Sequence, residues 1–285
     1  MKLTARSSIL DLSHPQVMGI LNVTPDSFSD GGIHNTFDAA LQHAAKMIEE
    51  GATIIDIGGE STRPGADDVS EQEELDRIIP VIESLVQRFD IWISVDTSKA
   101  IVMQEAAKAG AHMINDIRAL QEPGALEIAA KTELPICLMH MQGQPRTMQA
   151  EPHYEDVVSE VKNFLETQIE RCIAAGIAKN KLIIDPGFGF GKNLSHNYQL
   201  LAHLEEFHHF GLPILAGMSR KSMIGQLLHV PAQERVTGSI ACAVIAAMQG
   251  AQIIRVHDVK ETVQAMQVVQ ATLSEKSKQS PTQYR

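Results

Sequence analysis

The first thing this sequence lacks is positive charge. Its 285 residues include 24 Lys and Arg against 35 Asp and Glu, which gives a formal net charge of -11 at pH 7. A domain that binds nucleic acid normally presents a basic surface that displaces counterions from the phosphates. We therefore expect no nucleic-acid partner, and any anionic ligand must meet a local cluster of cations.

Paired cysteines and long apolar runs are also missing. Cys137, Cys172 and Cys242 are scattered through apolar or helical stretches, and no two have the spacing of a metal site or a redox motif. This pattern is typical of buried free thiols in a reducing compartment. No run reaches the roughly 18 apolar residues of a membrane span, and residues 1–15 lack the apolar core of a signal peptide. These absences predict a cytoplasmic protein with no membrane partner.

No linker divides the chain. The length alone would allow two domains, but no stretch rich in Pro, Gly or Ser and no long charge run interrupts the sequence. We expect one domain over residues 1–275, in which residues 1–16 form a small hairpin or cap. A polar, flexible tail is expected over residues 276–285.

What the sequence does contain is a repeated alternation of short apolar runs and longer stretches of helical period. The apolar runs cover residues 17–23, 52–59, 91–96, 111–117, 134–140, 181–187, 212–219 and 251–258. One intervening helix has a clear start, since Ser70 and Glu73 form a capping-box pattern. Near-continuous apolar strands separated by helices indicate a parallel sheet covered on both faces. Eight such units favour a single α/β domain, a (β/α)8 TIM barrel, over an open doubly wound sheet.

In such a barrel the carboxyl ends of the strands share one rim, where active sites lie. Polar residues stand at many of these predicted ends. They are Asn22, residues 58–63, Asp96, Asn115 with Asp116, His140, Asp185, residues 219–222, Arg255 and His257. A structural role alone would not need polar residues at the ends of so many strands.

Short acceptor and amide groups form one half of the rim. Asp96, Asn115 and Asp185 follow the third, fourth and sixth predicted strands, and they suit the donor edge of a flat heterocycle rich in N–H groups. The alternative is that each Asp caps the next helix, which Asp96 ahead of "TSKA" is best placed to do.

Cations form the other half. Arg63, Arg220, Lys221, Arg255 and His257 come from the second, seventh and eighth loops, and together they could clamp a phosphate or diphosphate. The helix predicted to start near Ser222 offers free N–H groups to a carboxylate or phosphate.

Several patterns are rejected as sites. The stretch "DPGFGFGKN" is no P-loop, because its first Gly is too close to the Gly-Lys pair and Asn193 replaces the magnesium-binding hydroxyl. Its glycines are expected to let the backbone approach a ligand, with Phe188 or Phe190 as an aromatic wall. The histidines of "HLEEFHHF" are assigned to surface or packing. Met139 and His140 lie near enough to the rim to line a pocket.

Two long segments carry a family resemblance. "MGILNVTPDSFSDGG" and "DIGGESTRPGA" are similar to the signature segments of the dihydropteroate synthase family. "SVDTSKA", "INDI", "LMHMQG", "DPGFGFGKN", "GMSRKSMIG" and "IIRVHDV" follow in that family's order, so the likeness spans about residues 12–269. It implies a transferase of folate biosynthesis and a sulfonamide target. The implied reaction condenses p-aminobenzoate with (7,8-dihydropterin-6-yl)methyl diphosphate to give 7,8-dihydropteroate and pyrophosphate.

The resemblance also implies residue roles. Asn22 would be the one protein ligand of Mg²⁺, the implied cofactor. The pterin diphosphate would be bound by Thr62, Asp96, Asn115, Met139, Asp185, Phe190, Lys221, Arg255 and His257. The p-aminobenzoate site would be formed by Phe28, Thr62, Arg63, Pro64, Phe190, Lys221 and Ser222. The groups expected to carry the reaction are Asn22, Arg63, Asp96, Lys221, Arg255 and His257.

The chemistry needs no strong base. Pyrophosphate leaves readily once its charge is neutralised, and an aryl amine is already neutral and nucleophilic at pH 7. This agrees with the absence of a convincing Ser-His-Asp or Cys-His set in the sequence. Two alternatives remain open, a pterin-binding methyltransferase and a non-catalytic pterin-binding protein, although neither needs the diphosphate clamp. The family likeness also implies a homodimer formed through helices on the barrel exterior.

Overall fold

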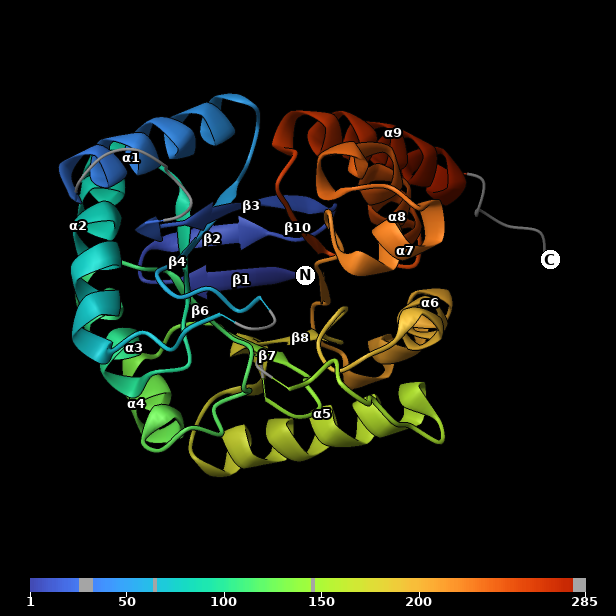
Figure 1. The fold of residues 1–285 in the computed structure, drawn as a ribbon, viewed down its shortest axis with the longest axis horizontal. Coiled ribbons are helices and arrows are strands. Elements are labelled where there is room, and N and C mark those ends of the chain that lie inside the picture. Colours follow the sequence, from blue (N-terminus) through green and yellow to red (C-terminus); the bar gives the residue numbers. More distant parts are fainter. Residues whose placement is uncertain (26–32, 64–65, 145–146, 279–285) are drawn as a thin grey trace.

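The structure is a computed structural model that describes residues 1–25, 33–63, 66–144 and 147–278. Eight parallel strands alternate with helices along the described chain, as the sequence predicts (Figure 1). The strands are β3 (Gln16–Asn22), β4 (Ile54–Gly58), β5 (Trp92–Asp96), β6 (Met113–Asp116), β7 (Ile136–Met139), β8 (Leu182–Asp185), β9 (Leu215–Ala216) and β10 (Ile253–Val256). Each falls within one of the eight apolar runs identified in the sequence, except that β3 begins one residue earlier, at Gln16.

Helices surround the strands on the outside (Figure 1). The α-helices are α1 (Ile33–Glu49), α2 (Glu71–Arg88), α3 (Ala100–Ala109), α4 (Ala125–Thr132), α5 (Val157–Ala174), α6 (Leu194–Ala202), α7 (Ser222–Leu228), α8 (Val236–Met248) and α9 (Val259–Lys278). Short 3-10 turns are η2 (Lys179–Lys181), η3 (Leu204–Phe210) and η4 (Ala232–Glu234). Helix α2 begins at the predicted capping box, because the Glu73 N–H donates to Ser70 Oγ and the Glu73 carboxylate accepts from the Ser70 N–H.

The sheet closes on itself. Its strand order is β8-β7-β6-β5-β4-β3-β10-β9, with every neighbouring pair parallel. The two end strands meet at a single bridge between Ile184 and Ile214, where the Ile184 N–H donates to the Pro213 carbonyl at 3.0 Å. The fold is therefore a (β/α)8 barrel, and the seam between β8 and β9 is its narrowest join.

The strands are buried on both faces, which explains their continuous apolar sequences. Every residue of β4, β6, β7 and β8 is buried. Alternate side chains fill the barrel or pack under the surrounding helices, so neither face of these four strands is exposed. The three cysteines are free and buried, as predicted.

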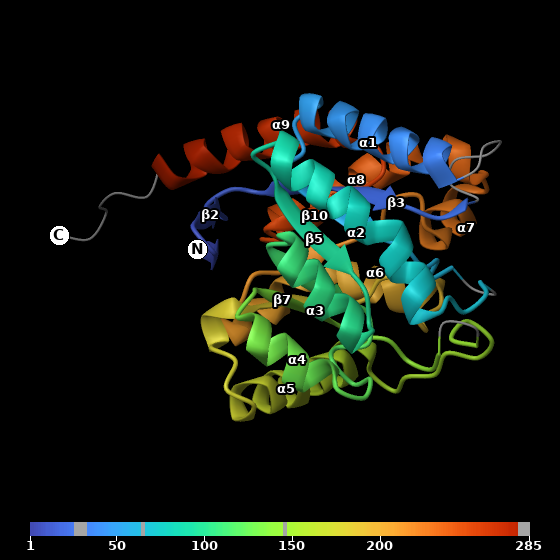
Figure 2. The ribbon, with the colours of Figure 1, turned by 90° about the vertical axis from the view of Figure 1, so that its left-hand side faces the viewer.

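The N-terminal residues form a separate two-stranded hairpin from β1 (Lys2–Ala5) and β2 (Ser8–Asp11). Figure 2 shows it at one end of the barrel, with α7 at the other. Leu3 and Leu10 are buried beneath it, and the Trp92 Nε1–H donates to Ser8 Oγ at 2.7 Å. The hairpin thus covers the end of the barrel at which the strands begin.

Helix α9 continues to Lys278, past the expected domain end at residue 275. Among the residues the structure describes, no helix combines the length and the apolar character needed to cross a bilayer.

Candidate active site

The carboxyl ends of the parallel strands bring most of the predicted site residues to one rim. Asn22, Asp96, Met139 and Asp185 are the last residues of β3, β5, β7 and β8. Asn115 lies within β6 and Arg255 within β10, with His257 just beyond. Lys221 caps α7 and Ser222 is its first, exposed residue. Phe28 and Pro64 lie outside the residues that the structure describes.

Arg255 is the centre of a charged network inside this rim. Its Nε donates to Asp56 Oδ2 at 2.7 Å, and its Nη2 donates to Asp96 Oδ2 at 3.2 Å. The same Asp56 oxygen accepts from Asn115 Nδ2 at 3.1 Å. Asp56 therefore links two of the predicted site residues, Arg255 and Asn115, although it was not itself among the predicted residues. Its one signal was a lone carboxylate inside a continuous apolar strand.

The charges in this network shift one another's pKa values. Burial and the nearby charge of Asp56 together raise the pKa of Asp96 to about 8, against the opposing effect of Arg255. Burial alone would lower the pKa of Arg255, but the carboxylates of Asp56 and Asp96 overcome that effect and raise it. Arg255 therefore stays charged while two acidic side chains share it. This leaves the rim with acceptor capacity for a ligand that donates hydrogen bonds.

Asp96 does not cap the following helix. The N-cap position of α3 is Lys99, with no side-chain capping bond, and the Lys99 N–H donates instead to Thr97 Oγ1 at 3.2 Å. The helix-cap interpretation of Asp96 is therefore wrong. Its neighbour Asp116 is structural, since it accepts from Ser98 Oγ at 2.5 Å and from backbone N–H groups of residues 118 and 120.

Asp185 and Lys221 form a second polar pair across the seam. Asp185 Oδ1 accepts from the Gly187 N–H at 2.8 Å, and burial raises the pKa of Asp185 while Lys221 lowers it. Burial lowers the pKa of Lys221 to about 8, and the charge of Asp185 works against that shift. Lys221 Nζ donates to the Phe188 carbonyl at 2.6 Å. This lysine thus presents a cation next to a buried carboxylate at the rim.

Phe190 supplies the aromatic wall that the sequence suggested. It packs with Ile117, Met139 and Met148, and Lys221 Nζ lies 4.8 Å from the centre of its ring. Phe188 is fully buried in the main core, so its assignment as a possible wall is wrong.

Two of the glycines in residues 187–191 have a different function from the one predicted. A Cβ at Gly187 would lie 1.8 Å from the His140 carbonyl oxygen, and one at Gly191 would lie 2.3 Å from that of Gln142. These two glycines therefore let two backbone segments approach each other, not a ligand. The Asn193 side chain caps α6, which agrees with the rejection of a P-loop.

Lys192 holds this turn from inside. Its Nζ donates to the carbonyls of Gly187 at 2.7 Å and Phe190 at 3.0 Å, and it lies 2.9 Å from His140 Nδ1. Burial, with Lys192 beside it, lowers the pKa of His140 to about 2, so this histidine is neutral. His140 is buried beneath the turn, where its ring packs against Tyr154 and Phe164.

Two members of the predicted cationic set behave differently from the expectation. Arg220 forms a two-bond pair with Asp258, at 2.9 and 2.6 Å, so its charge is already matched. His257 Nδ1 lies 3.0 Å from Ser219 Oγ, and the backbone N–H of His257 donates to the same oxygen at 3.1 Å. Burial and the neighbouring arginines lower the pKa of His257 to about 4. It is therefore a neutral hydrogen-bonding group at pH 7.

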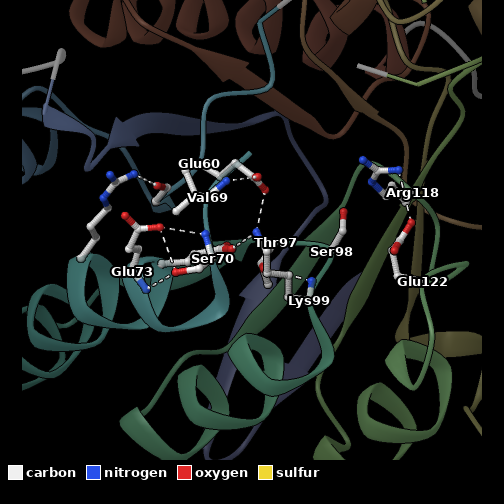
Figure 3. A network of polar contacts seen from close by, with 12 residues as sticks. Glu60, Val69, Ser70, Glu73, Thr97, Ser98, Lys99, Arg118 and Glu122 are labelled. Carbon is white, nitrogen blue, oxygen red and sulfur yellow. Dashed lines mark hydrogen bonds and ion pairs between the residues drawn. The ribbon is translucent and has the colours of Figure 1, made fainter. Parts of the chain in front are cut away.

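The segment after β4 lines a cavity of about 280 Å³ beside Asp96. Its lining includes Glu60 and Thr62 from this segment and Thr97, Ser98 and Arg118 from the following loops. Figure 3 shows Glu60, Thr97, Ser98 and Arg118 around this region. Arg63 is exposed on the same segment. Thr62 and Asp96 thus line the same cavity.

The metal-binding assignment of Asn22 rests on its position and chemistry. It is half-buried at the end of β3, which pairs with β10, the strand that carries Arg255. No cluster of three acidic, His or Cys side chains suited to a metal occurs among the described residues. An amide oxygen is a suitable hard ligand for Mg²⁺ that takes its other ligands from phosphate and water. The residues present therefore fit such an ion.

Comparisons with known proteins agree with this fold. The family described as "Pterin binding enzyme" matches residues 18–257. Dihydropteroate synthase of Escherichia coli (strain K12) is 71% identical over 276 residues, covering 97% of this chain and 98% of that one. A crystal structure of Yersinia pestis dihydropteroate synthase with a sulfonamide drug is 74% identical, with a TM-score of 0.92, and covers 96% of this chain and 100% of that chain.

A third relative has been solved with a bound ligand. The dihydropteroate synthase of Xanthomonas albilineans in complex with 7,8-dihydropteroate is 49% identical, with a TM-score of 0.89, covering 96% of this chain and 99% of that chain. Each of these similarities extends over nearly the full length of this chain and of the protein compared with it. The chain therefore belongs to the pterin binding enzyme family and, within it, to the dihydropteroate synthases.

Proposed function

We propose that this chain condenses p-aminobenzoate with (7,8-dihydropterin-6-yl)methyl diphosphate and releases 7,8-dihydropteroate and pyrophosphate. The observation that carries the proposal is that buried hydrogen-bond acceptors and cations meet at one rim of the barrel. The chain also matches dihydropteroate synthases over almost its whole length. It is a transferase, and the group moved is the pterin-methyl group.

The pterin would lie on the buried side of the rim. Asp96, Asp185 and Asn115 offer oxygen acceptors to the N–H groups of the ring, and Lys221 offers a donor. Phe190 and Met139 provide an apolar surface for its flat face. Burial makes these contacts specific, because a ligand that left the carboxylates unpaired would bear the cost of their desolvation.

The diphosphate would lie toward β3 and β10. Arg255 supplies the charge, His257 a hydrogen bond, and Asn22 the amide oxygen that would hold Mg²⁺. A bound magnesium ion would neutralise part of the negative charge that develops on the leaving pyrophosphate. Arg255 would remain in place during this step because Asp56 holds its Nε.

The p-aminobenzoate would lie at the open side, between the segment after β4 and the start of α7. Thr62 and Arg63 border it from the first, and Lys221 and Ser222 from the second. The free N–H groups at the start of α7 and the Lys221 ammonium would receive its carboxylate. Phe190, beside Lys221, would contact the aromatic ring.

The chain's own groups can then carry the reaction by positioning and charge stabilisation. The bond between the methylene carbon and the diphosphate oxygen breaks, and the electron pair leaves with pyrophosphate. The dihydropterin ring delocalises the positive charge left on the methylene carbon. The neutral aryl amine attacks that carbon, the C–N bond forms, and the amine proton is released to solvent or pyrophosphate. No covalent intermediate with the protein is needed.

Two broader assignments belong to the same proposal. A homodimer through the barrel exterior is supported by exposed apolar side chains on α7 and α8, namely Leu227, Leu228, Ile245 and Met248. A reducing, cytoplasmic location is supported by the three free cysteines.

Pyrophosphate release by the purified protein is the direct test. The protein is supplied with the dihydropterin diphosphate and Mg²⁺, with and without p-aminobenzoate. Release that depends on p-aminobenzoate and yields dihydropteroate is expected. Tight pterin binding without release would instead indicate a methyltransferase-type or non-catalytic pterin-binding protein.

A further inference from the structure

Lys99 forms a bridge directly behind the candidate site. It stands at the N-cap of α3, and its Nζ lies 2.6 Å from Glu74 Oε2 on α2 and 2.9 Å from Glu60 Oε2 after β4. Figure 3 shows Glu60, Val69 and Lys99 in one polar network with the start of α2. One ammonium group therefore joins three consecutive parts of the barrel wall.

The bridge is stabilised by the need of the buried Glu74 carboxylate for a cation. Glu74 is completely buried, and its Oε1 atom has no hydrogen-bond partner among the residues described. A buried carboxylate is costly unless a cation compensates it. Glu60 and Glu74 together raise the pKa of Lys99 against the opposing effect of burial. Lys99 is thus a permanent cation at this point.

Glu60 connects this cation to the segment that borders the cavity. Its second oxygen, Oε1, accepts from the Val69 N–H at 3.1 Å, so one side chain spans the two ends of the segment from residue 60 to residue 69. Just before it, the Gly59 carbonyl accepts from Arg77 Nη1 at 2.8 Å. Both ends of the segment are therefore tied to α2 and α3. Thr62 and Arg63 lie between these ends.

We propose that Lys99 is a positioning residue for the reaction. It orients Glu60 through the 2.9 Å ion pair, and Glu60 in turn holds residues 60 and 69 together. The segment that begins at Glu60 carries Thr62, which lines the same cavity as Asp96, and then Arg63. Lys99 itself would not touch a substrate. The inference rests on the proposed function, in which Thr62 and Arg63 border the p-aminobenzoate.

The competing explanation is that Lys99 only compensates Glu74 and so stabilises the packing of α2 on α3. A charge-balanced pair of variants separates the two roles. Lys99→Met alone leaves Glu74 buried and uncompensated, and a loss of folding would be uninformative. Lys99→Met combined with Glu74→Gln removes the buried pair together, while Glu60 still loses its partner.

The double variant should recover most of the stability lost in Lys99→Met but keep a raised KM for p-aminobenzoate. The expected rise is about tenfold, the size of one lost charge-assisted hydrogen bond. Affinity for a pterin without diphosphate should stay the same, because its contacts come from strand ends and from Phe190 and Lys221, outside the segment that Glu60 holds. Lys108→Met is the matched control, since Lys108 is on α3 and forms an exposed pair with Glu105 at 2.7 Å.

Hydrogen exchange at the Val69 amide gives a readout that needs no catalysis. In the ligand-free protein, exchange at Val69 should quicken in the double variant and in Glu60→Ala, which removes the acceptor itself. It should remain as in wild type in Lys108→Met. Glu60→Gln, which keeps an acceptor oxygen but loses the charge, should be intermediate.

The outcomes that overturn the proposal are distinct from those that overturn the proposed function. A double variant with both stability and KM restored would make Lys99 a structural residue only. Unchanged exchange at Val69 would show that Lys99 does not hold Glu60 in place. A wild-type protein that made no dihydropteroate would instead refute the proposed function, and the exchange measurement would still report on the Lys99 bridge.

Discussion

The two ends of this barrel use polar side chains in opposite ways. At the hairpin end, Lys181 donates to the Thr4 carbonyl at 2.6 Å, Arg6 Nε to the Ala111 carbonyl at 3.2 Å, and Trp92 to the Ser8 hydroxyl. Each donor there meets a neutral acceptor of the chain. At the rim, Arg255 is shared by two carboxylates, and the buried Asp56 Oδ1 has no partner within the described residues. Polar groups close one end and leave hydrogen-bonding capacity at the other.

The largest expected effect comes from removing the central cation of the rim. Arg255→Ala leaves Asp56 and Asp96 buried without their partner, and we expect the free energy of unfolding to fall by about 3–5 kcal/mol. Urea unfolding of the ligand-free protein measures this. Adding Asp56→Asn should recover part of the loss, because one uncompensated charge is removed. A loss below 1 kcal/mol would mean that the network is not held by Arg255.

A smaller effect, on binding alone, is expected at Asp185. Asp185→Asn removes an acceptor for the pterin but keeps an oxygen for the Gly187 N–H. Affinity for the pterin, with or without its diphosphate, should fall about 10- to 100-fold, which is about 1.4–2.8 kcal/mol. Stability should hardly change, because burial already raises the pKa of this carboxyl and so disfavours its charge. Calorimetric titration checks the affinity, and unchanged binding would remove Asp185 from the site.

The smallest effect is expected at the hairpin end, where stability should fall and activity should not. Trp92→Phe keeps an aromatic ring but loses the N–H that reaches Ser8, at a cost of about 1 kcal/mol in unfolding free energy. Turnover should stay at the wild-type value, because the change lies at the far end of the strands. A loss of turnover without a loss of stability would contradict the division between the two ends.

The sequence was most informative where a pattern repeats. Eight apolar runs predicted eight strands, because strands buried on both faces must be apolar throughout. The rule that parallel strands share one carboxyl edge then placed Asp96, Asn115, Asp185 and Arg255 together. Neither step needed knowledge of any side-chain contact.

What the sequence could not predict depends on contacts between distant segments. Whether Arg220 or Lys221 faces the pocket depends on a turn in which Arg220 has φ of 56° and pairs with Asp258. The burial of His140 depends on Lys192, which lies in another loop. Asp56 was missed because its partners Arg255 and Asn115 come from two other strands. Asp96 resembled a helix cap only because the sequence alone does not show where α3 begins.

The narrow seam between β8 and β9 has a consequence for ligands. Strand β9 is two residues long, and a single bridge joins it to β8. Asp185 ends β8, and Lys221 follows β9, so these two groups stand on opposite sides of that join. A ring that forms hydrogen bonds with both groups would connect β8 and β9 across this join. The substrate would then supply part of the cohesion that this short strand lacks, and the protein would resist heat better when loaded than when empty.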